Sequence, residues 1–187
     1  MLAKLVEETM NAVVNAVKGV DNVLDAVRDS VKDQAVAALQ GVGDIANQGI
    51  DTIESVIRGG LESASSVGGS LVDVVSGTVG GVLTAIAETG GDVLSLTGKT
   101  VGAAIREASD LGEDLGDTAV GAVTGAVNAA EKVGVSTTDA LKEAVLAAIK
   151  SADAIGGAAG QTVRDALLSA MALPRDAIDS IISGSNE

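Results

Sequence analysis

Carboxylates, amines, guanidinium groups and hydroxyls are the chemically active groups of this chain, because the sequence contains no His and no Cys. Glu7-Glu8 and Glu113-Asp114 could bind a divalent cation weakly through their oxygens. The commonest ligands of transition metals and the commonest activators of a nucleophile are missing. The composition therefore predicts a protein that is not an enzyme and that has no catalytic residue, metal or cofactor.

The tripeptide Gly98-Lys99-Thr100 has the residue order that ends a phosphate-binding loop. Such a loop also needs a glycine five residues before Gly98, and that position is occupied by Val93. No alternation of strand and helix patterns surrounds the tripeptide. We therefore expect no nucleotide site here.

Threonines recur with an 11-residue spacing at Thr78, Thr89 and Thr100. This spacing is typical of ice-binding helices, which makes a helical ice-binding protein a minor alternative. Only three successive segments share it, and the neighbouring positions are not rich in alanine.

The charge balance excludes one class of partner. The 187 residues carry 26 acidic and 12 basic side chains, a formal net charge of −14. Nucleic-acid binding draws its affinity from concentrated Lys and Arg, so we expect no nucleic-acid partner. The chain also has no Phe, Tyr or Trp, so any core must be built from many small contacts among Val, Ala, Leu, Ile and Gly.

The elements that would position these groups follow from a repeat of eleven residues. Written in rows of eleven, the sequence fills 17 rows from Met1 to Glu187 without a gap. Ten of the residues in the seventh column are charged, as are ten in the eleventh. Columns one, two, five and nine contain no charge, and column six contains only Arg28.

Eleven residues complete three helical turns at about 3.67 residues per turn, so each column keeps a nearly constant direction along a helix. The apolar columns then occupy one arc of about 130°, opposite columns seven and eleven. The pattern predicts an all-α fold of long amphipathic helices, either straight or folded back as hairpins, packed in a right-handed or straight assembly. The residues expected on this apolar assembly face are Val75, Val79, Val82, Leu83, Ile86, Val93, Leu94, Val101, Ile105, Val123 and Val127.

Glycine makes a lone helix of this sequence unstable. The chain has 24 Gly, each costing about 1 kcal/mol relative to Ala in a helix interior, so the helices must be held by burial of their apolar face. Several glycines lie four residues apart, a spacing that can let helices approach closely. The expected close-packing glycines are Gly77, Gly81, Gly98, Gly102, Gly121 and Gly125.

Interruptions of the helical pattern are few, and residues 1–187 are expected to form a single repeat region. Residues 133–137 are the best candidate for a turn, because Ser136-Thr137-Thr138-Asp139 is typical of a helix N-cap. Pro174 predicts a kink or break over 173–175.

Stretches such as 79–87 (VGGVLTAIA) and 120–127 (VGAVTGAV) resemble the 11-residue repeats of synucleins and of perilipin-type lipid-droplet proteins. Phasins, which coat storage granules, are a looser likeness. The resemblance implies helices that bind a lipid or granule surface. The polar face of this chain is mainly acidic, whereas the helices of those families are flanked by lysines.

Two functions are left open by the sequence. In the first, the chain is a structural protein whose helices self-associate through the apolar face into a homo-oligomeric bundle, sheet or filament. In the second, it is a peripheral coat on a neutral lipid or storage-granule surface. The N-terminal residues reach Glu7 and Glu8 before any apolar run long enough for a signal peptide, which predicts a cytoplasmic protein, associated in the second case with an inclusion or membrane surface.

Overall fold

The computed structural model describes residues 1–40, 42–43 and 49–184. The fold is all-α with 83% helix, and the described residues form nine α-helices and no strand. The helices are α1 (Leu2–Val17), α2 (Val23–Leu39), α3 (Ile50–Glu62), α4 (Leu71–Glu88), α5 (Val93–Leu111), α6 (Leu115–Val133), α7 (Thr137–Ile155), α8 (Gly157–Ser169) and α9 (Arg175–Gly184).

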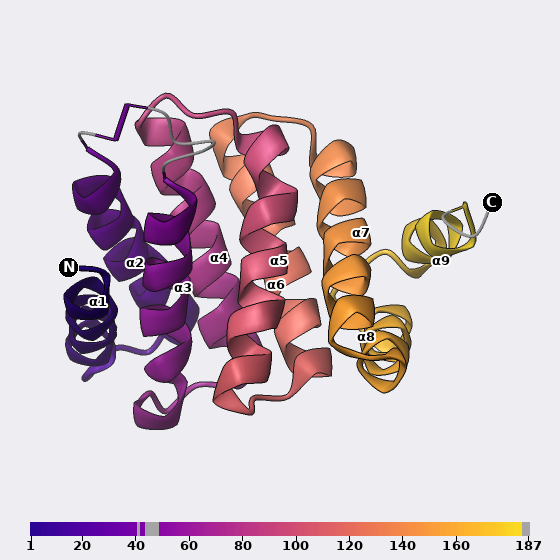
Figure 1. Cartoon of the computed structure of the whole chain (residues 1–187), viewed down its shortest axis with the longest axis horizontal. Helices are drawn as coiled ribbons and strands as arrows, with labels where there is room; N and C mark the ends of the chain where they lie inside the picture. The colour runs from indigo at the N-terminus through magenta and orange to yellow at the C-terminus, as the bar shows by residue number, and fades with distance from the viewer. Residues whose placement is uncertain (41, 44–48, 185–187) are drawn as a thin grey trace.

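Two layers of helices make up the molecule (Figure 1). In one layer α2 packs on α4, α4 on α6 and α6 on α8, while in the other α1 packs on α3, α3 on α5 and α5 on α7. Each of α1 to α7 therefore has its most extensive contact with a helix two positions away in the sequence, whereas α8 packs mainly on α7. Helices α1 and α9 lie at opposite ends of the array, with α9 set against α7 and α8 (Figure 1).

Helix starts in the centre of the chain recur every 22 residues, which is two rows of eleven. The N-cap side chains of α4 to α7 each accept a hydrogen bond from the backbone N–H three residues further on. This contact satisfies one of the donors that the first turn of a helix leaves open. These N-caps are Ser70, Asp92, Asp114 and Ser136.

Helix ends follow the same 22-residue spacing. Gly90, Gly112 and Gly134 have φ values of 82°, 75° and 79°, in the left-handed region where a side chain is strained. Behind Gly112, the N–H of Glu113 donates to the carbonyl of Ala108 over 2.9 Å. This hydrogen bond closes the end of α5 in the manner typical of a glycine-terminated helix.

The helices are shorter and more numerous than the sequence pattern indicates. The chain turns between α6 and α7 at residues 134–136, inside the range 133–137, and it leaves helix between Ser169 and Arg175, around Pro174. It also turns between α4 and α5 and between α5 and α6, where no break was expected. The physical reason is the pairing of a left-handed glycine with an Asp N-cap two residues later, at Gly90 with Asp92 and at Gly112 with Asp114.

One helix in the described part of the chain, Leu71–Glu88, is long and apolar enough to cross a membrane by length and composition. Its mean hydropathy is 1.5, and 72% of it is buried inside the fold. A mostly buried core helix meets the same criterion, and α4 lies between α2 and α6 within its layer.

Candidate functional site: a groove between α5 and α7

The residues expected on the apolar face lie mainly in the interior of the single chain. Val75, Val79, Val82, Leu83, Ile86, Val101, Ile105 and Val123 are fully buried, Val93 is almost so, and Leu94 and Val127 are half-buried. The apolar arc that the repeat maintains is thus covered by neighbouring helices of the same chain. Apart from Leu94, these side chains join α4, α5 and α6 into one core.

Two of the three expected glycine pairs lie directly against the backbone of a neighbouring helix. A Cβ placed on Gly81 in α4 would come within 2.6 Å of the carbonyl oxygen of Arg28 in α2. A Cβ placed on Gly121 in α6 would come within 2.7 Å of the carbonyl oxygen of Val72 in α4. Real Cβ atoms essentially never approach so closely, so these helices touch backbone to backbone.

Gly77 and Gly125 complete those pairs in the same way, facing α2 and α4 respectively. Along each contact the residue numbers of both helices rise together, so α2, α4 and α6 are parallel. Glycine is required here because any side chain would push the two backbones apart.

The third pair, Gly98 and Gly102 on α5, faces α7 across a wider gap. A Cβ on Gly98 would meet the Cβ of Ala147 at 3.6 Å, and a Cβ on Gly102 would meet the hydroxyl of Ser151 at 2.9 Å. The nearest backbone atom of α7 to the Gly98 position is the carbonyl oxygen of Glu143 at 4.0 Å. Helix α7 therefore meets this pair with side chains, whereas α2 and α4 cover the other pairs with backbone.

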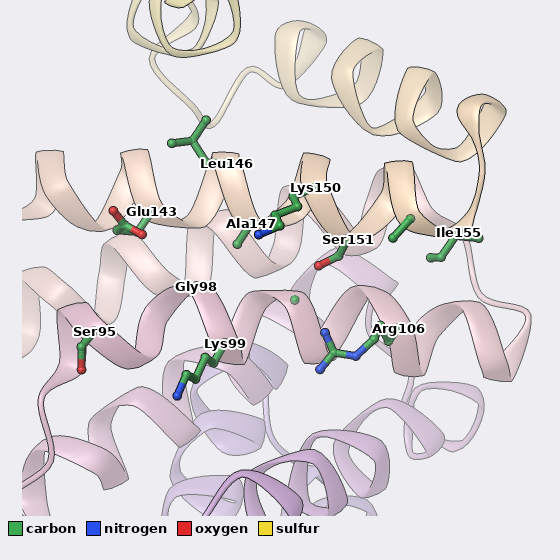
Figure 2. A pocket seen from close by; sticks show the side chains of 12 residues that line it. Ser95, Gly98, Lys99, Arg106, Glu143, Leu146, Ala147, Lys150, Ser151 and Ile155 are labelled. Carbon is green, nitrogen blue, oxygen red and sulfur yellow. The ribbon is translucent and has the colours of Figure 1, made fainter. Parts of the chain in front are cut away.

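This wider spacing leaves a groove of about 660 Å³ between α5 and α7 (Figure 2). Its α5 side is built from residues spaced three or four apart, which share one helix face. Gly98, Gly102, Ala147 and Ala154 give it small side chains, and Ile155, 43% exposed, adds an apolar group at one end. The remaining lining residues are Ser95, Lys99, Arg106, Glu143, Leu146, Lys150 and Ser151.

The walls of the groove carry positive charge. Lys99 and Arg106 extend from α5 and Lys150 and Glu143 from α7, with the Lys99 side chain on the side of α5 away from α7 (Figure 2). Arg106 is held in place by α3, since its Nη2 donates to Oε1 of Glu54 over 2.6 Å. With Glu54 and Glu143 set against Lys99, Arg106 and Lys150, the groove is a partly apolar surface with an excess of one positive charge, on a chain of net charge −14.

A second cluster of charges lies between α3 and α5. Arg58 donates from Nη1 to Glu107 over 3.1 Å and from Nε to Glu62 over 3.0 Å. Burial raises the pKa of the Glu107 carboxyl above its ordinary value, and the nearby Arg58 opposes that shift. Because Arg58 ties Glu107 into an ion-pair network between α3 and α5, we assign this carboxyl to the stability of the fold rather than to a reactive site.

The other chemically active residues are not brought together. No group of three or more Asp or Glu among the described residues is placed to hold a metal ion. Gly98, Lys99 and Thr100 lie inside helix α5, so they form no phosphate-binding loop. Thr78 and Thr100 are fully buried, and their hydroxyls donate to the carbonyls of Val74 and Leu96 four residues before them. They therefore cannot belong to an exposed row of threonines of the kind that binds ice.

Sequence reasoning did not single out the three cations of the groove, although the repeat contains a signal for them. Lys99 stands in the eleventh column, and Arg106 and Lys150 stand in the seventh. These two columns are mainly acidic, but they also hold Lys18 and Lys132, which do not line the groove. Only the packing of α5 beside α7 shows that the three share one groove.

No known family profile matches the sequence, and no curated protein matches it either. The function is therefore inferred from the arrangement of the residues alone.

Proposed function

We propose that this chain is a non-enzymatic structural protein whose folded copies associate with one another. The observation that carries the proposal is the positive groove between α5 and α7 on a chain of net charge −14. A surface of one sign on a molecule dominated by the other sign is electrostatically complementary to further copies of that molecule. Ile155 at one end of the groove adds apolar area that is exposed in a single copy.

The apolar face has a different role in this proposal from the one expected from the sequence. Val82 and Ile86 are fully buried within one chain, so the face stabilises the fold of each copy. Assembly then joins folded units through their outer surfaces. In this proposal the apolar columns face mainly inward, with Leu2 and Ile155 as exposed exceptions.

The alternative function, a coat on a neutral lipid or storage-granule surface, requires the same side chains to face outward. The backbone contacts of Gly81 with α2 and of Gly121 with α4 would have to separate. Close packing of this kind is lost as a whole when the helices part, so the folded form opposes spreading on a surface.

Circular dichroism and analytical gel filtration of lipid-free protein, repeated with neutral-lipid droplets, test the proposal. We expect a strongly helical signal without lipid, elution ahead of an 18.2 kDa monomer, and no gain of helix on addition of droplets. A coil-like spectrum that becomes helical only on the droplets would overturn the proposal and establish the coat. A helical species that elutes as a monomer at every concentration would also overturn it.

A further inference from the structure

Helix α9 is attached to the array differently from α1, the helix at the other end. A Cβ on Gly59 in α3 would come within 2.5 Å of the carbonyl oxygen of Val6, so α1 and α3 touch backbone to backbone. A Cβ on Gly184, the glycine of α9, would meet no atom within 4 Å. Helix α9 packs on α7 and α8, outside the two layers (Figure 1). Among the described residues, no glycine locks α9 to the array as Gly59 locks α1.

Apolar side chains hold α9 in its seat, by which we mean the surface of α7 and α8 that this helix covers. Ile178 and Ile182 are buried and lie four residues apart on one helix face. A hollow of about 340 Å³ lies between Leu146 of α7 and Ile181 of α9. Leu146 points from α7 away from α5, and it is only half-buried with α9 in place (Figure 2). The seat is therefore apolar and incompletely filled.

Charges fix α8 to the array but not α9. The charged residues of α9, Arg175, Asp176 and Asp179, are exposed, and within the described ranges none of them forms an ion pair. In contrast, Arg164 of α8 donates from Nη1 and Nη2 to the two carboxylate oxygens of Asp153 in α7, over 2.9 and 2.6 Å. Because this bidentate contact joins α7 to α8, the seat can keep its shape when α9 leaves it.

The linker before α9 can change its conformation without breaking a helix. Residues 170–174 lie between α8 and α9, and Met171 is fully exposed. Inside the linker the N–H of Leu173 donates to the carbonyl of Ala170 over 3.4 Å, which is long for a hydrogen bond. Pro174 has no N–H to lose. Fully extended, the linker spans at most about 18 Å, so it can carry α9 only to a copy whose C-terminal end lies alongside.

Resting on the proposed self-association, we propose that two copies of the chain exchange α9, so that the α9 of each copy occupies the seat on α7 and α8 of the other. The seat is the same in every copy, so an exchanged helix regains the contacts that it makes within its own chain. Only the linker takes a new conformation. The exchange is reciprocal, and it joins two copies about a two-fold axis with the ends of their arrays side by side.

Disulfide formation between two single-cysteine variants tests the exchange, because the chain has no Cys of its own. Leu146→Cys and Ile181→Cys each place one thiol at the hollow. The two full-length variants are unfolded together in urea, refolded at high protein concentration and treated with oxidised glutathione, which is reduced to two thiols as each protein disulfide forms. A disulfide from position 146 to position 181 can only join two copies. We expect this disulfide to be a main product in the mass spectrum of the digested mixture.

Asp179→Cys, mixed in the same way with Leu146→Cys, is the matched control. Asp179 is exposed and lies about 200° round the helix from Ile181, so its side chain faces away from the hollow. Random collisions favour the more exposed thiol, whereas seating of α9 favours position 181. The control should therefore give about tenfold less disulfide to position 146, because a disulfide needs the two Cα atoms to lie within about 7 Å.

Two further variants with the same net charge measure the contribution of α9 to self-association. Ile178→Asp places a carboxylate on the buried side of α9, whereas Ser183→Asp places one on its exposed side. Ile178→Asp should weaken self-association by about tenfold or more, because the exchanged helix no longer fits its seat. Ser183→Asp should associate as the parent does. Circular dichroism should show intact helices in both, since α9 lies at the end of the array.

The outcomes separate this inference from the proposed function. If the parent chain associates but position 146 forms no more disulfide with position 181 than with position 179, the exchange is wrong and self-association stands. If the parent chain does not associate at any concentration, both are wrong. If Ile178→Asp fails to fold, the comparison of Ile181→Cys with Asp179→Cys still decides the question.

Discussion

A Cβ atom placed on Gly98 would lie 3.6 Å from the Cβ of Ala147, an ordinary van der Waals contact. The same atom placed on Gly125 would overlap the backbone carbonyl oxygen of Ser76. A methyl group at Gly98 would therefore fit against α7, whereas a methyl group at Gly125 would collide with the backbone of α4. The fold therefore requires glycine at Gly125, whereas at Gly98 the glycine only shapes the outer surface.

The first prediction compares Gly98→Ala with Gly125→Ala. Ala is favoured over Gly by about 1 kcal/mol in a helix, so Gly98→Ala should raise the free energy of unfolding by roughly that amount. Gly125→Ala forces α4 and α6 apart, and overpacking typically costs about 1–3 kcal/mol, so it should lower that free energy. Urea unfolding followed by circular dichroism measures both.

Gly98→Ala should weaken self-association, although it raises the free energy of unfolding of the single chain. The added methyl group raises the floor of the groove, so the more stable variant should associate more weakly than the parent. Equal destabilisation by both alanine substitutions would show that α5 and α7 pack as closely as α4 and α6.

The second prediction concerns the inward side of the repeat. Ile86 is fully buried in α4, so Ile86→Asp places an unpaired carboxylate in the core and should lower the free energy of unfolding by several kcal/mol. Asp117 is exposed on α6, and Asp117→Asn should change stability and assembly little, beyond a salt-dependent shift from reduced repulsion. Thermal unfolding of both variants checks the assignment. A stable Ile86→Asp protein beside an unstable Asp117→Asn protein would mean that the inward side had been misassigned.

The third prediction is a pH dependence at Glu107. Because burial raises the pKa of this carboxyl in the folded state, the folded chain binds the proton more tightly than the unfolded chain does. The stabilising contribution of the protonated group is present below the ordinary Glu range and is lost as pH rises through the raised pKa. As pH rises from the acid range to neutrality, the free energy of unfolding of the parent should therefore fall relative to that of Glu107→Gln.

Chemical unfolding of the two proteins at a series of pH values gives this difference directly. Glu54→Gln is a useful comparison, because Glu54 pairs with Arg106 at a more exposed position, with 32% of its side chain accessible. The raised pKa would be contradicted if the difference in free energy of unfolding between parent and Glu107→Gln did not depend on pH, or if it changed with pH in the opposite direction.

The all-helical class could be predicted from the eleven-residue columns, since Val82, Ile86 and Ile105 in the apolar columns are all fully buried. The turns were harder to see. Two rows of eleven make one helix and its turn, so the columns stay aligned through Gly90 and Gly112 as if the helix continued. The local signal for each turn is a glycine followed two residues later by an Asp N-cap, and the unbroken eleven-residue period makes this signal easy to miss.

The groove could not be predicted from the sequence, because it depends on the distance between two helices that are not consecutive. Gly98 and Gly121 have the same four-residue glycine spacing, yet α4 covers Gly121 with backbone and α7 covers Gly98 with a side chain. That difference arises from how the whole α5 layer packs on its neighbours. The charges of Lys99 and Lys150 acquire a common role only through this packing.

Sedimentation equilibrium of the lipid-free parent chain tests the central claim most directly, since it measures mass without reference to shape. At physiological ionic strength the account predicts an average mass that exceeds 18.2 kDa and rises with protein concentration, while the helical circular dichroism signal stays constant. A mass of 18.2 kDa at every concentration, for a protein that is fully helical, would contradict it.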